Sequence, residues 1–426
     1  MPRIPDIPGN RVPPRSEQDS WVRDQVARLC QVDSRRFPGS QPVSFTKSDL
    51  AKLETQDFWV CEKSDGVRVL LLVSTDHTNT QMVFLIDRKN DYYELSGLYF
   101  PHHKNPQLPL QNTIVDGELV YDVDPRTNHE TMRFLAFDCL VVDGENIMHR
   151  PLDKRYGRLQ DYFYKPFAKM KKDHPQVTQN HPFDIRVKPI QFSYAAEMVF
   201  GEMVNLQHGS DGLIYTCVNA PYIPATDSNI LKWKPPSENS IDFKLVLRFP
   251  PDLDNPSQPD FHAKPIFLLH VWCGDTKYEQ YDQMYVEDDE WEKMKSSGEQ
   301  YDDRIVEVHW DPAHKHWRMM RFRDDKPNGN HKSIVDKIII SIADGVEKDG
   351  LLERSNSIRT AWKARAARGP PPPSNVPMQT TPAIPHHANS MSGWAVSLDS
   401  VLRYGRLATS KWSKVGGPLV VAGMNR

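Results

Sequence analysis

Short apolar runs alternate with short polar breaks between residues 67 and 148, and this alternation limits the possible folds more than any other feature. The breaks, such as 87–91 and 124–128, are too short to hold a helix. The pattern therefore predicts antiparallel hairpins and argues against repeated β-α-β units. The predicted strands are 69–73, 82–86, 92–95, 113–115, 119–121 and 133–137.

The rest of the chain divides into further segments, and the predicted fold class is α+β. Helices are predicted at 152–172 and 194–207, and strands at 184–188 and 212–216. The composition changes at Lys-Pro-Pro-Ser, so we place a domain boundary near residue 237. The short strands that follow, with an acidic helical insertion at 286–295, suit a small OB-fold barrel. The predicted parts are an arm at 1–18, a catalytic domain at 19–236, the barrel at 237–332, a helical extension at 333–368 and a mostly disordered Pro-rich linker and tail at 369–426.

Composition and charge restrict the class of protein. The chain has 426 residues, and 53 Lys and Arg against 56 Asp and Glu give a net charge of −3. Any contact with nucleic acid must therefore come from a local basic cleft. The five cysteines lie far apart and form no Cys-x-x-Cys pair, which argues against a zinc site and a disulfide framework. No signal-peptide core or membrane-length apolar run is present, so we expect an intracellular protein without a membrane partner.

The segment 61–68, Cys-Glu-Lys-Ser-Asp-Gly-Val-Arg, leads directly into the strand 69–73 and places Lys63 at its mouth. If the segment is extended, Cys61, Lys63 and Asp65 share one face. A lysine can act as a nucleophile only when burial or neighbouring cations lower its pKa. Taken alone, such a lysine is more often a surface residue paired with an acid.

Acidic residues at two strand positions extend the pattern. Asp116 and Glu118 lie inside an apolar strand, where a carboxylate needs a partner such as a ribose hydroxyl or a divalent metal. Asp211 stands at the entrance to the strand 212–216.

Two groups of cations complete it. Lys232 and Lys234 would share one face of a strand, with Trp233 packed on the other, and a triphosphate could lie between two such cations. Arg321 and Arg323 share a face in the second domain, where only domain closure could bring them to a leaving pyrophosphate.

In this order the segments resemble the covalent lysyl-nucleotidyltransferase superfamily of ATP-dependent DNA ligases, RNA ligases and mRNA capping enzymes. Within it, the chain is most similar to eukaryotic mRNA guanylyltransferases of the fungal kind. The distinguishing residues are 37–44, the Lys-x-Asp-Gly-x-Arg form of the motif at Lys63, Asp87-Arg88 and 317–326. The resemblance covers about residues 20 to 345.

The resemblance implies that Lys63 attacks the α-phosphate of GTP, releases pyrophosphate, and passes GMP to the 5′-diphosphate end of nascent RNA to form a GpppN cap. It also implies Mg²⁺ or Mn²⁺ as a cofactor, held by Glu118 and Asp211. The remaining contacts with GTP, as the resemblance implies them, are ribose contacts by Arg68 and Glu118, a ribose or phosphate contact by Arg88, stacking of guanine on Phe100, phosphate and ribose contacts by Lys232 and Lys234, a neighbouring acid at Asp242, and closing-domain cations at Arg321, Arg323 and Lys326.

The resemblance further implies a separate RNA 5′-triphosphatase subunit, the phosphorylated C-terminal tail of RNA polymerase II as a partner, and a nuclear location. Two alternatives stay open. An ATP-dependent polynucleotide ligase would need a DNA-encircling domain, and the residues upstream of Lys63 are too few for one. A catalytically silent RNA-binding scaffold would be expected to lack Lys63 or the later lysine pair.

Overall fold

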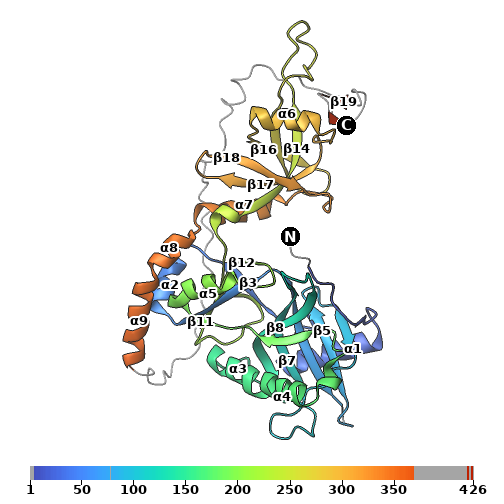
Figure 1. Ribbon diagram of the computed structural model, residues 1–426, viewed down its shortest axis with the longest axis vertical. Coiled ribbons are helices and arrows are strands. Elements are labelled where there is room, and N and C mark those ends of the chain that lie inside the picture. Colours follow the sequence, from blue (N-terminus) through green and yellow to red (C-terminus); the bar gives the residue numbers. More distant parts are fainter. Residues whose placement is uncertain (1–3, 77, 369–419, 422–423, 426) are drawn as a thin grey trace. The chain divides into compact units, whose positions relative to one another are not determined.

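The computed structural model describes residues 4–76, 78–368, 420–421 and 424–425, and these form two compact units (Figure 1). Within the described residues, unit 1 comprises 4–76, 78–234 and 348–368, and unit 2 comprises 235–347, 420–421 and 424–425. The division after residue 234 lies close to the predicted boundary at 236/237. The predicted tail at 369–426 lies outside the described residues, apart from the short strands β19 (Val420–Val421) and β20 (Met424–Asn425).

The larger sheet of unit 1 has eight strands and is built from hairpins. Its strands pair in the order β1-β6-β5-β4-β7-β8-β10, with β9 also paired to β8. All neighbours are antiparallel except β8 and β10, so the predicted hairpins are confirmed. The strands are β1 (Asn10–Arg11), β4 (Val67–Thr75), β5 (Gln81–Asp87), β6 (Tyr92–Leu95), β7 (Thr113–Val123), β8 (Glu130–Val142), β9 (Glu145–Asn146) and β10 (Asp184–Val187).

Helices cover both faces of this sheet (Figure 1). On one face α1 (Glu17–Cys30) packs against Leu70 and Leu72 of β4. On the other face the side chains of Val69 and Leu71 pack under three consecutive helical segments. A strand that is covered on both sides must be apolar throughout, which explains the uninterrupted apolar run at 69–73. The three segments are α3 (Leu152–Arg158), the π-helix η1 (Leu159–Tyr164) and α4 (Lys165–Asp173).

The smaller sheet of unit 1 has five strands in the order β11-β3-β12-β13-β2. Its members β2 (Ser40–Ser44), β3 (Phe58–Ser64) and β11 (Gln191–Phe192) were not predicted, whereas β12 (Ser210–Cys217) matches the strand predicted at 212–216. β3 alternates buried and half-buried residues along its whole length. The fifth strand is β13 (Ala225–Trp233). The remaining short elements of unit 1 are α2 (Asp49–Thr55), η2 (Pro175–Thr178), η3 (Ser193–Ala195) and α5 (Ala196–Met203).

Unit 2 is a closed five-stranded barrel in the order β14-β15-β16-β18-β17. Its helix α6 (Asp288–Ser296) is the predicted acidic insertion, and it buries Trp291 and Met294 against the barrel while its acidic side stays exposed. A five-stranded barrel with one such helix is the arrangement of an OB-fold. Its other elements are η4 (Pro236–Glu238), β14 (Ser240–Arg248), β15 (Ile266–Trp272), β16 (Tyr278–Met284), β17 (Ile305–Asp311), β18 (His316–Phe322) and α7 (Lys332–Ala343).

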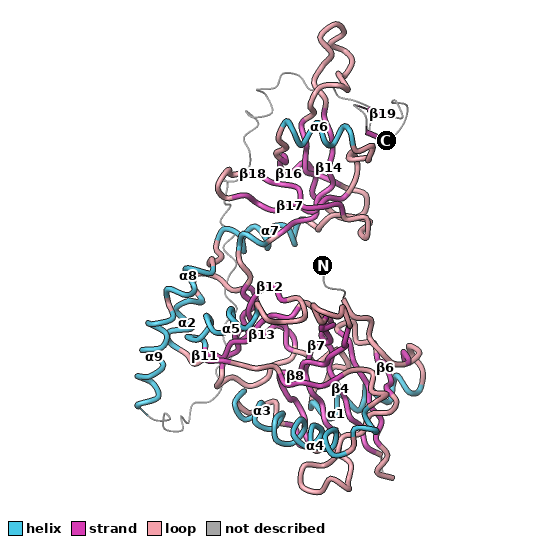
Figure 2. Tube along the Cα trace, viewed as in Figure 1, coloured by secondary structure: helices cyan, strands magenta, loops and turns pink. Residues whose placement is uncertain are grey.

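The helices of the predicted extension at 333–368 belong to different units. α7 packs on the barrel of unit 2, whereas α8 (Lys348–Glu353) and α9 (Ser355–Arg368) belong to unit 1 (Figure 2). Trp362 of α9 contacts the rings of Phe192 and Tyr194, with centroids 4.9 and 5.6 Å away. Arg365 donates to Asp57, just before β3, at 2.9 Å. These contacts join residues more than 160 positions apart, so sequence periodicity alone does not reveal them.

The predicted N-terminal arm is also part of unit 1 over its described residues. β1 pairs with β6, and the side chain of Ser16 caps α1 by accepting a hydrogen bond from the backbone of Asp19 at 3.1 Å. Among the described residues, no helix is both long enough and apolar enough to cross a membrane.

Candidate active site

A cavity of about 620 Å³ lies between the two sheets of unit 1. Residues from strands of both sheets line it, together with α3 and the segment after β10. Five of the predicted site residues lie in its lining, namely Lys63, Arg68, Arg88, Glu118 and Lys232. Asp211 and Lys234 adjoin them through ion pairs. The structure therefore gathers side chains from five separate parts of the chain around one space.

Lys63 lies where the chain passes from the smaller sheet to the larger one. It is the penultimate residue of β3, and the turn at Asp65 and Gly66 leads into β4. A Cβ atom on Gly66 would lie 2.2 Å from the carbonyl oxygen of Leu119, so only glycine fits this turn. The backbone N–H of Gly66 donates to Oε1 of Glu118 at 3.2 Å. This tight crossing fixes the nucleophile candidate beside the carboxylate.

A β-bulge in β12 aims Asp211 at Lys63. The pairing of β3 and β12 skips from Ser210 to Leu213, so Asp211 and Gly212 have no partner in the ladder. Nζ of Lys63 forms an ion pair with Oδ1 of Asp211, and Nζ of Lys234 lies 3.6 Å from Oδ2. Bulges of this kind redirect side chains next to active sites. The carboxylate of Asp211 thus pairs with two lysines, Lys63 in β3 and Lys234 directly after the strand 225–233.

Lys232 adds another cation to the cavity. Burial lowers its pKa, and the charges of Lys63 and Arg88 lower it further. Trp233, the next residue, is 1% exposed and packs on the opposite face, as predicted. Cations that repel one another in this way form a favourable site for a polyphosphate, which relieves the repulsion. Nη2 of Arg88 donates to Gln41 at 2.8 Å at the edge of the same space.

Arg68 and Asp116 form a buried pair, which changes the interpretation of Asp116. Nε and Nη2 of Arg68 donate to the two carboxylate oxygens at 3.0 and 2.6 Å. The hydroxyl of Tyr222 donates to Oδ2 of Asp116 at 2.6 Å, and Arg68 also donates to the carbonyl of Ser40. Asp116 is fully buried, so its partner is this cation and not a ribose or a metal. Arg68 still lines the cavity, where it is held rigidly.

Glu118 and Asp211 are the predicted metal ligands, and their surroundings fit oxygen ligation of a hard cation. Burial raises the pKa of Glu118, while the charges of Lys188, Lys63 and Arg68 act in the opposite direction. A desolvated carboxylate is stabilised by a cation beside it. Mg²⁺ commonly takes one or two carboxylates and fills its other positions with water and substrate phosphates. Asp211 would exchange one of its lysine contacts for such a cation.

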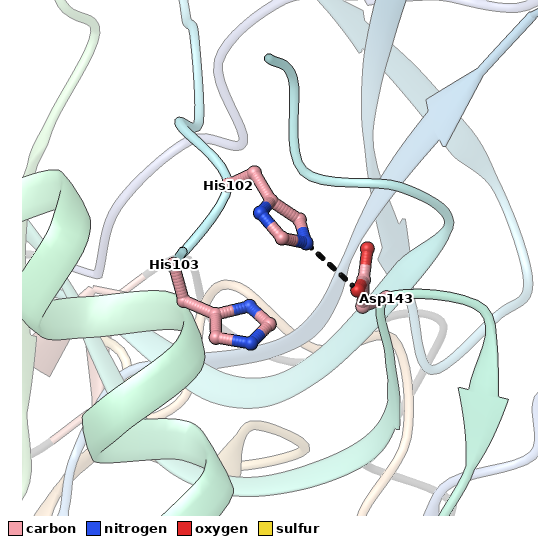
Figure 3. A group of neighbouring side chains, drawn as sticks. All are labelled: His102, His103 and Asp143. Atoms are coloured by element: carbon pink, nitrogen blue, oxygen red, sulfur yellow. Dashed lines mark hydrogen bonds and ion pairs between the residues drawn. The ribbon is translucent and has the colours of Figure 1, made fainter. Parts of the chain in front are cut away.

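Two groups of three possible ligands with nearby donor atoms occur among the described residues, and neither includes Glu118 or Asp211. In the first, Nε2 of His102 lies 3.0 Å from Asp143 (Figure 3). His103 stacks on Tyr162. Nδ1 of His102 accepts the backbone N–H groups of Lys104 and Asn105 at 3.2 and 3.3 Å. The proton of the neutral ring therefore sits on Nε2, which leaves no lone pair toward Asp143 for a metal. His102 is an anchor for its loop. The second group is Asp311, His314 and His316 on the surface of unit 2.

Phe100 is not in the cavity, and its assignment to base stacking is corrected. It is fully buried in the core, where its ring stacks on Phe163 and Phe167 with centroids 5.0 and 5.3 Å apart. Phe137, at the end of the predicted strand 133–137, is one of four aromatic residues that line the cavity, with Trp59, Tyr156 and Tyr222. Lys188, which also lines it, was missed because a single lysine after a short strand carries no signal of its own.

The predicted site residues of unit 2 form a separate cluster around buried Asp242. Nη1 of Arg323 lies 3.1 Å from Oδ1 of Asp242, and Nζ of Lys326 pairs with Oδ2. Arg321 donates to Glu307 at 2.6 Å, and Arg323 lies 3.6 Å from the same oxygen. Within unit 2, Asp242 therefore pairs with two of the predicted barrel cations.

Comparison with known proteins gives consistent matches along the chain. The sequence model of the mRNA capping enzyme catalytic domain matches residues 4–236, and that of the C-terminal domain matches 238–352. The mRNA-capping enzyme subunit alpha of Neurospora crassa is 42% identical over 82% of this chain and 91% of its own length. The corresponding subunit of Yarrowia lipolytica is 40% identical over 86% and 93%. A solved mycobacterial DNA ligase D with ATP and MES is 14% identical and covers 68% of this chain and 95% of its own, with a TM-score of 0.33. At this identity and TM-score, the ligase structure carries no information on the substrate of this chain.

Proposed function

Since the chain belongs to the mRNA capping enzyme family, we propose that it is a GTP:RNA guanylyltransferase that carries GMP on Lys63. The observation that supports this most is the position of Lys63 in the cavity, paired with Asp211 and close enough to Lys232 to lower its pKa. A single lysine among carboxylates and further cations is what a covalent transfer of a nucleoside monophosphate needs.

In the first step, deprotonated Nζ of Lys63 attacks the α-phosphorus of GTP. A P–N bond forms and its nitrogen releases a proton to water, the bond to the bridging oxygen breaks, and pyrophosphate leaves with that electron pair. Lys232, Lys234 and Arg88 are the cations of unit 1 available to the phosphates. Asp211 orients Nζ through its ion pair. Mg²⁺ or Mn²⁺, held by Glu118 and Asp211, would screen the phosphate charge.

In the second step, a terminal phosphate oxygen of 5′-diphosphate RNA attacks the same phosphorus. The P–N bond breaks, Lys63 recovers its amine, and the GpppN cap is released. Dividing the transfer in this way uses one cavity twice, since the nucleotide stays attached while pyrophosphate and RNA exchange. The unit 2 cations Arg321, Arg323 and Lys326 would serve the leaving pyrophosphate if the units close.

Base selection is proposed to involve Phe137 and Lys188. Phe137 is one of the aromatic residues that line the cavity, and Nζ of Lys188 lies 5.9 Å from the centre of its ring. A base stacked on Phe137 would therefore bring its edge near a buried ammonium. Guanine offers the acceptor O6 at the position where adenine carries a donating amino group, so the ammonium favours guanine.

The partners follow from the same assignment. The two fungal relatives are named as alpha subunits, which supports a second subunit. We assign that subunit as a separate RNA 5′-triphosphatase that produces the diphosphate end, and we propose the phosphorylated tail of RNA polymerase II as a further partner, in the nucleus. Retention of a phosphorylated but not an unphosphorylated tail peptide by the purified chain would test the polymerase contact.

The decisive experiment incubates the purified chain with magnesium or manganese and α-labelled GTP or ATP, then denatures it and measures label on the polypeptide. We expect label from GTP, its loss in Lys63→Ala, and its retention in Lys52→Ala. Lys52 is the matched control because it lies in α2 of the same unit and pairs with Asp49 at 2.7 Å. Label from ATP alone would indicate a ligase, and label from neither nucleotide would favour a silent scaffold.

A further inference from the structure

Glu62, the residue before Lys63, points to the opposite face of β3 and enters a buried group of charges. Oε1 of Glu62 lies 3.1 Å from Nζ of Lys188 and 3.4 Å from Nε2 of His208. Nδ1 of His208 lies 2.7 Å from Asp122. We call these four residues the Glu62 cluster. Each of their side chains is less than one tenth exposed, so the charged groups are stabilised by one another and not by water.

His208 is the link in the cluster. Both of its ring nitrogens face carboxylate oxygens, so both must donate, and the ring carries a positive charge. It joins β3 to β7 through Glu62 and Asp122. Without His208, Glu62 would keep only Lys188 and Asp122 only Arg133, so each buried carboxylate would lose one of its charged partners, which is unfavourable. The cluster therefore fixes the side chain of Glu62 in one position.

The pairing of β3 with β12 is irregular at Lys63. The bulge that directs Asp211 toward the cavity shifts the register here, since Ser64 pairs with Ser210 but Glu62 pairs with Leu213. Bulges disturb the regular ladder and are common next to active sites. The nucleophile thus lies at an irregular position of its own strand.

Hydrogen bonds to the Glu62 cluster hold the residues on both sides of Lys63. Nζ of Lys188 donates at 3.0 Å to the backbone carbonyl of Glu62, which belongs to the peptide group that precedes Lys63. On the other side, Oγ of Ser64 donates at 2.9 Å to Oε1 of Glu62. The residue before Lys63 is therefore held through its backbone by Lys188, and the residue after Lys63 is held through its side chain by the Glu62 carboxylate. One step further, the N–H of Asp65 donates to the carbonyl of Gly209, next to His208, at 2.8 Å.

We propose that His208 and Glu62 are positioning residues that hold the backbone around Lys63 in the geometry for attack on the nucleotide. This inference rests on the proposed function. The side chains of His208 and Glu62 are absent from the lining of the 620 Å³ cavity, so they act through Lys63 and not on the substrate. Loss of the restraint should slow formation of the covalent bond without weakening the binding of GTP.

The test compares His208→Gln with His102→Gln. Both remove a partly buried histidine of unit 1 that faces an aspartate, at 2.7 Å for His208 and 3.0 Å for His102, but only the first touches the Glu62 cluster. The full chain is mixed with magnesium and labelled GTP, and rapid quenching gives the rate of adduct formation at saturation and the Kd for GTP. We expect a rate about 10-fold or more below wild type for His208→Gln, with Kd within about 3-fold, and a rate within about 2-fold for His102→Gln.

Two further variants keep the inference falsifiable if His208→Gln folds poorly. Ser64→Ala removes one hydrogen bond without uncovering a charge, and it should lower the same rate by about 3-fold or more. His208→Lys restores the positive charge, has room in an adjoining cavity of about 460 Å³, and should recover part of the rate.

Equal rates in wild type and Ser64→Ala, or equal losses in His208→Gln and His102→Gln, would overturn the positioning role and leave the proposed function intact. A wild-type chain that forms no adduct would instead overturn the proposed function. An equal loss of rate in His208→Lys and His208→Gln would show that the charge of His208 is not what matters.

Discussion

The charge on His208 makes the stability of unit 1 depend on pH in a direction opposite to that of a histidine buried in its neutral form. Burial alone would lower the pKa of His208, but hydrogen bonds and charges from Asp122 and Glu62 outweigh it and raise the pKa to about 9. The folded chain therefore holds this proton more tightly than the unfolded chain, whose value is near 6.5. The stabilisation is complete below pH 6.5 and disappears as the pH rises through 9.

The magnitude follows from the two pKa values. A difference of between 2 and 3 units corresponds to about 3 kcal/mol below pH 6.5, between about 2 and 3 kcal/mol at pH 7, about 1 kcal/mol at pH 8 and close to zero at pH 10. The pKa of Glu62 is lowered to about 2, against the effect of its burial, by Lys188 and His208. That shift describes the same attraction from the other partner and is not added.

His208→Gln removes the titrating group, so the free energy of unfolding of the variant should lack this pH dependence. Because the chain has two units, unfolding in urea is best followed by a short deuterium pulse and mass spectrometry of peptides from β3, which report on unit 1 alone. The gap between wild type and variant should narrow by about 2 kcal/mol or more between pH 7 and pH 10. A gap that stays constant over this range would refute the assignment of a charged His208.

Other substitutions test single contacts. Lys63→Arg should form no adduct while the thermal unfolding temperature stays near that of wild type, because a guanidinium remains protonated and cannot attack. Gly212→Ala should lower the free energy of unfolding by more than about 2 kcal/mol in denaturant titrations, because Gly212 has φ +155° and a Cβ there would lie 2.1 Å from the carbonyl oxygen of Trp233. Lys188→Met should raise the ratio of ATP to GTP labelling by about 10-fold or more, since the buried donor to O6 is lost; an unchanged ratio would remove Lys188 from base selection. A chain ending at residue 368 should label at the wild-type rate, whereas one ending at residue 347 should show early unfolding of β3 by hydrogen exchange, because α9 holds Asp57 and Phe192.

The hairpin sheet, the barrel and most of the polar residues of the cavity could be predicted because each depends on local signals. Strand periodicity, short turns and the alternation of faces around Trp233 are properties of a few consecutive residues. The partner of Asp116 could not be predicted, because Arg68 and Tyr222 reach it from distant segments. Phe100 was misassigned because an aromatic next to a proline looks the same whether it packs in a core or faces a ligand.

The missed strand β3 has the same explanation. Trp59, Cys61 and Lys63 face the cavity, and Glu62 is buried only because Lys188 and His208 come to meet it. A buried glutamate in a short run breaks the apolar pattern from which a strand is predicted. The partners that make its burial possible lie more than 120 residues away in the sequence, and nothing within the run indicates them.

The return of α8 and α9 to unit 1 has a consequence for synthesis of the chain. A ribosome completes residues 4–234 well before it reaches 348–368, and all of the barrel is made in between. The surface of Phe192 and Tyr194 that Trp362 will cover therefore stays open while the barrel emerges and folds. Arg365 can bond to Asp57, just before the strand that carries Lys63, only after α9 has left the exit tunnel.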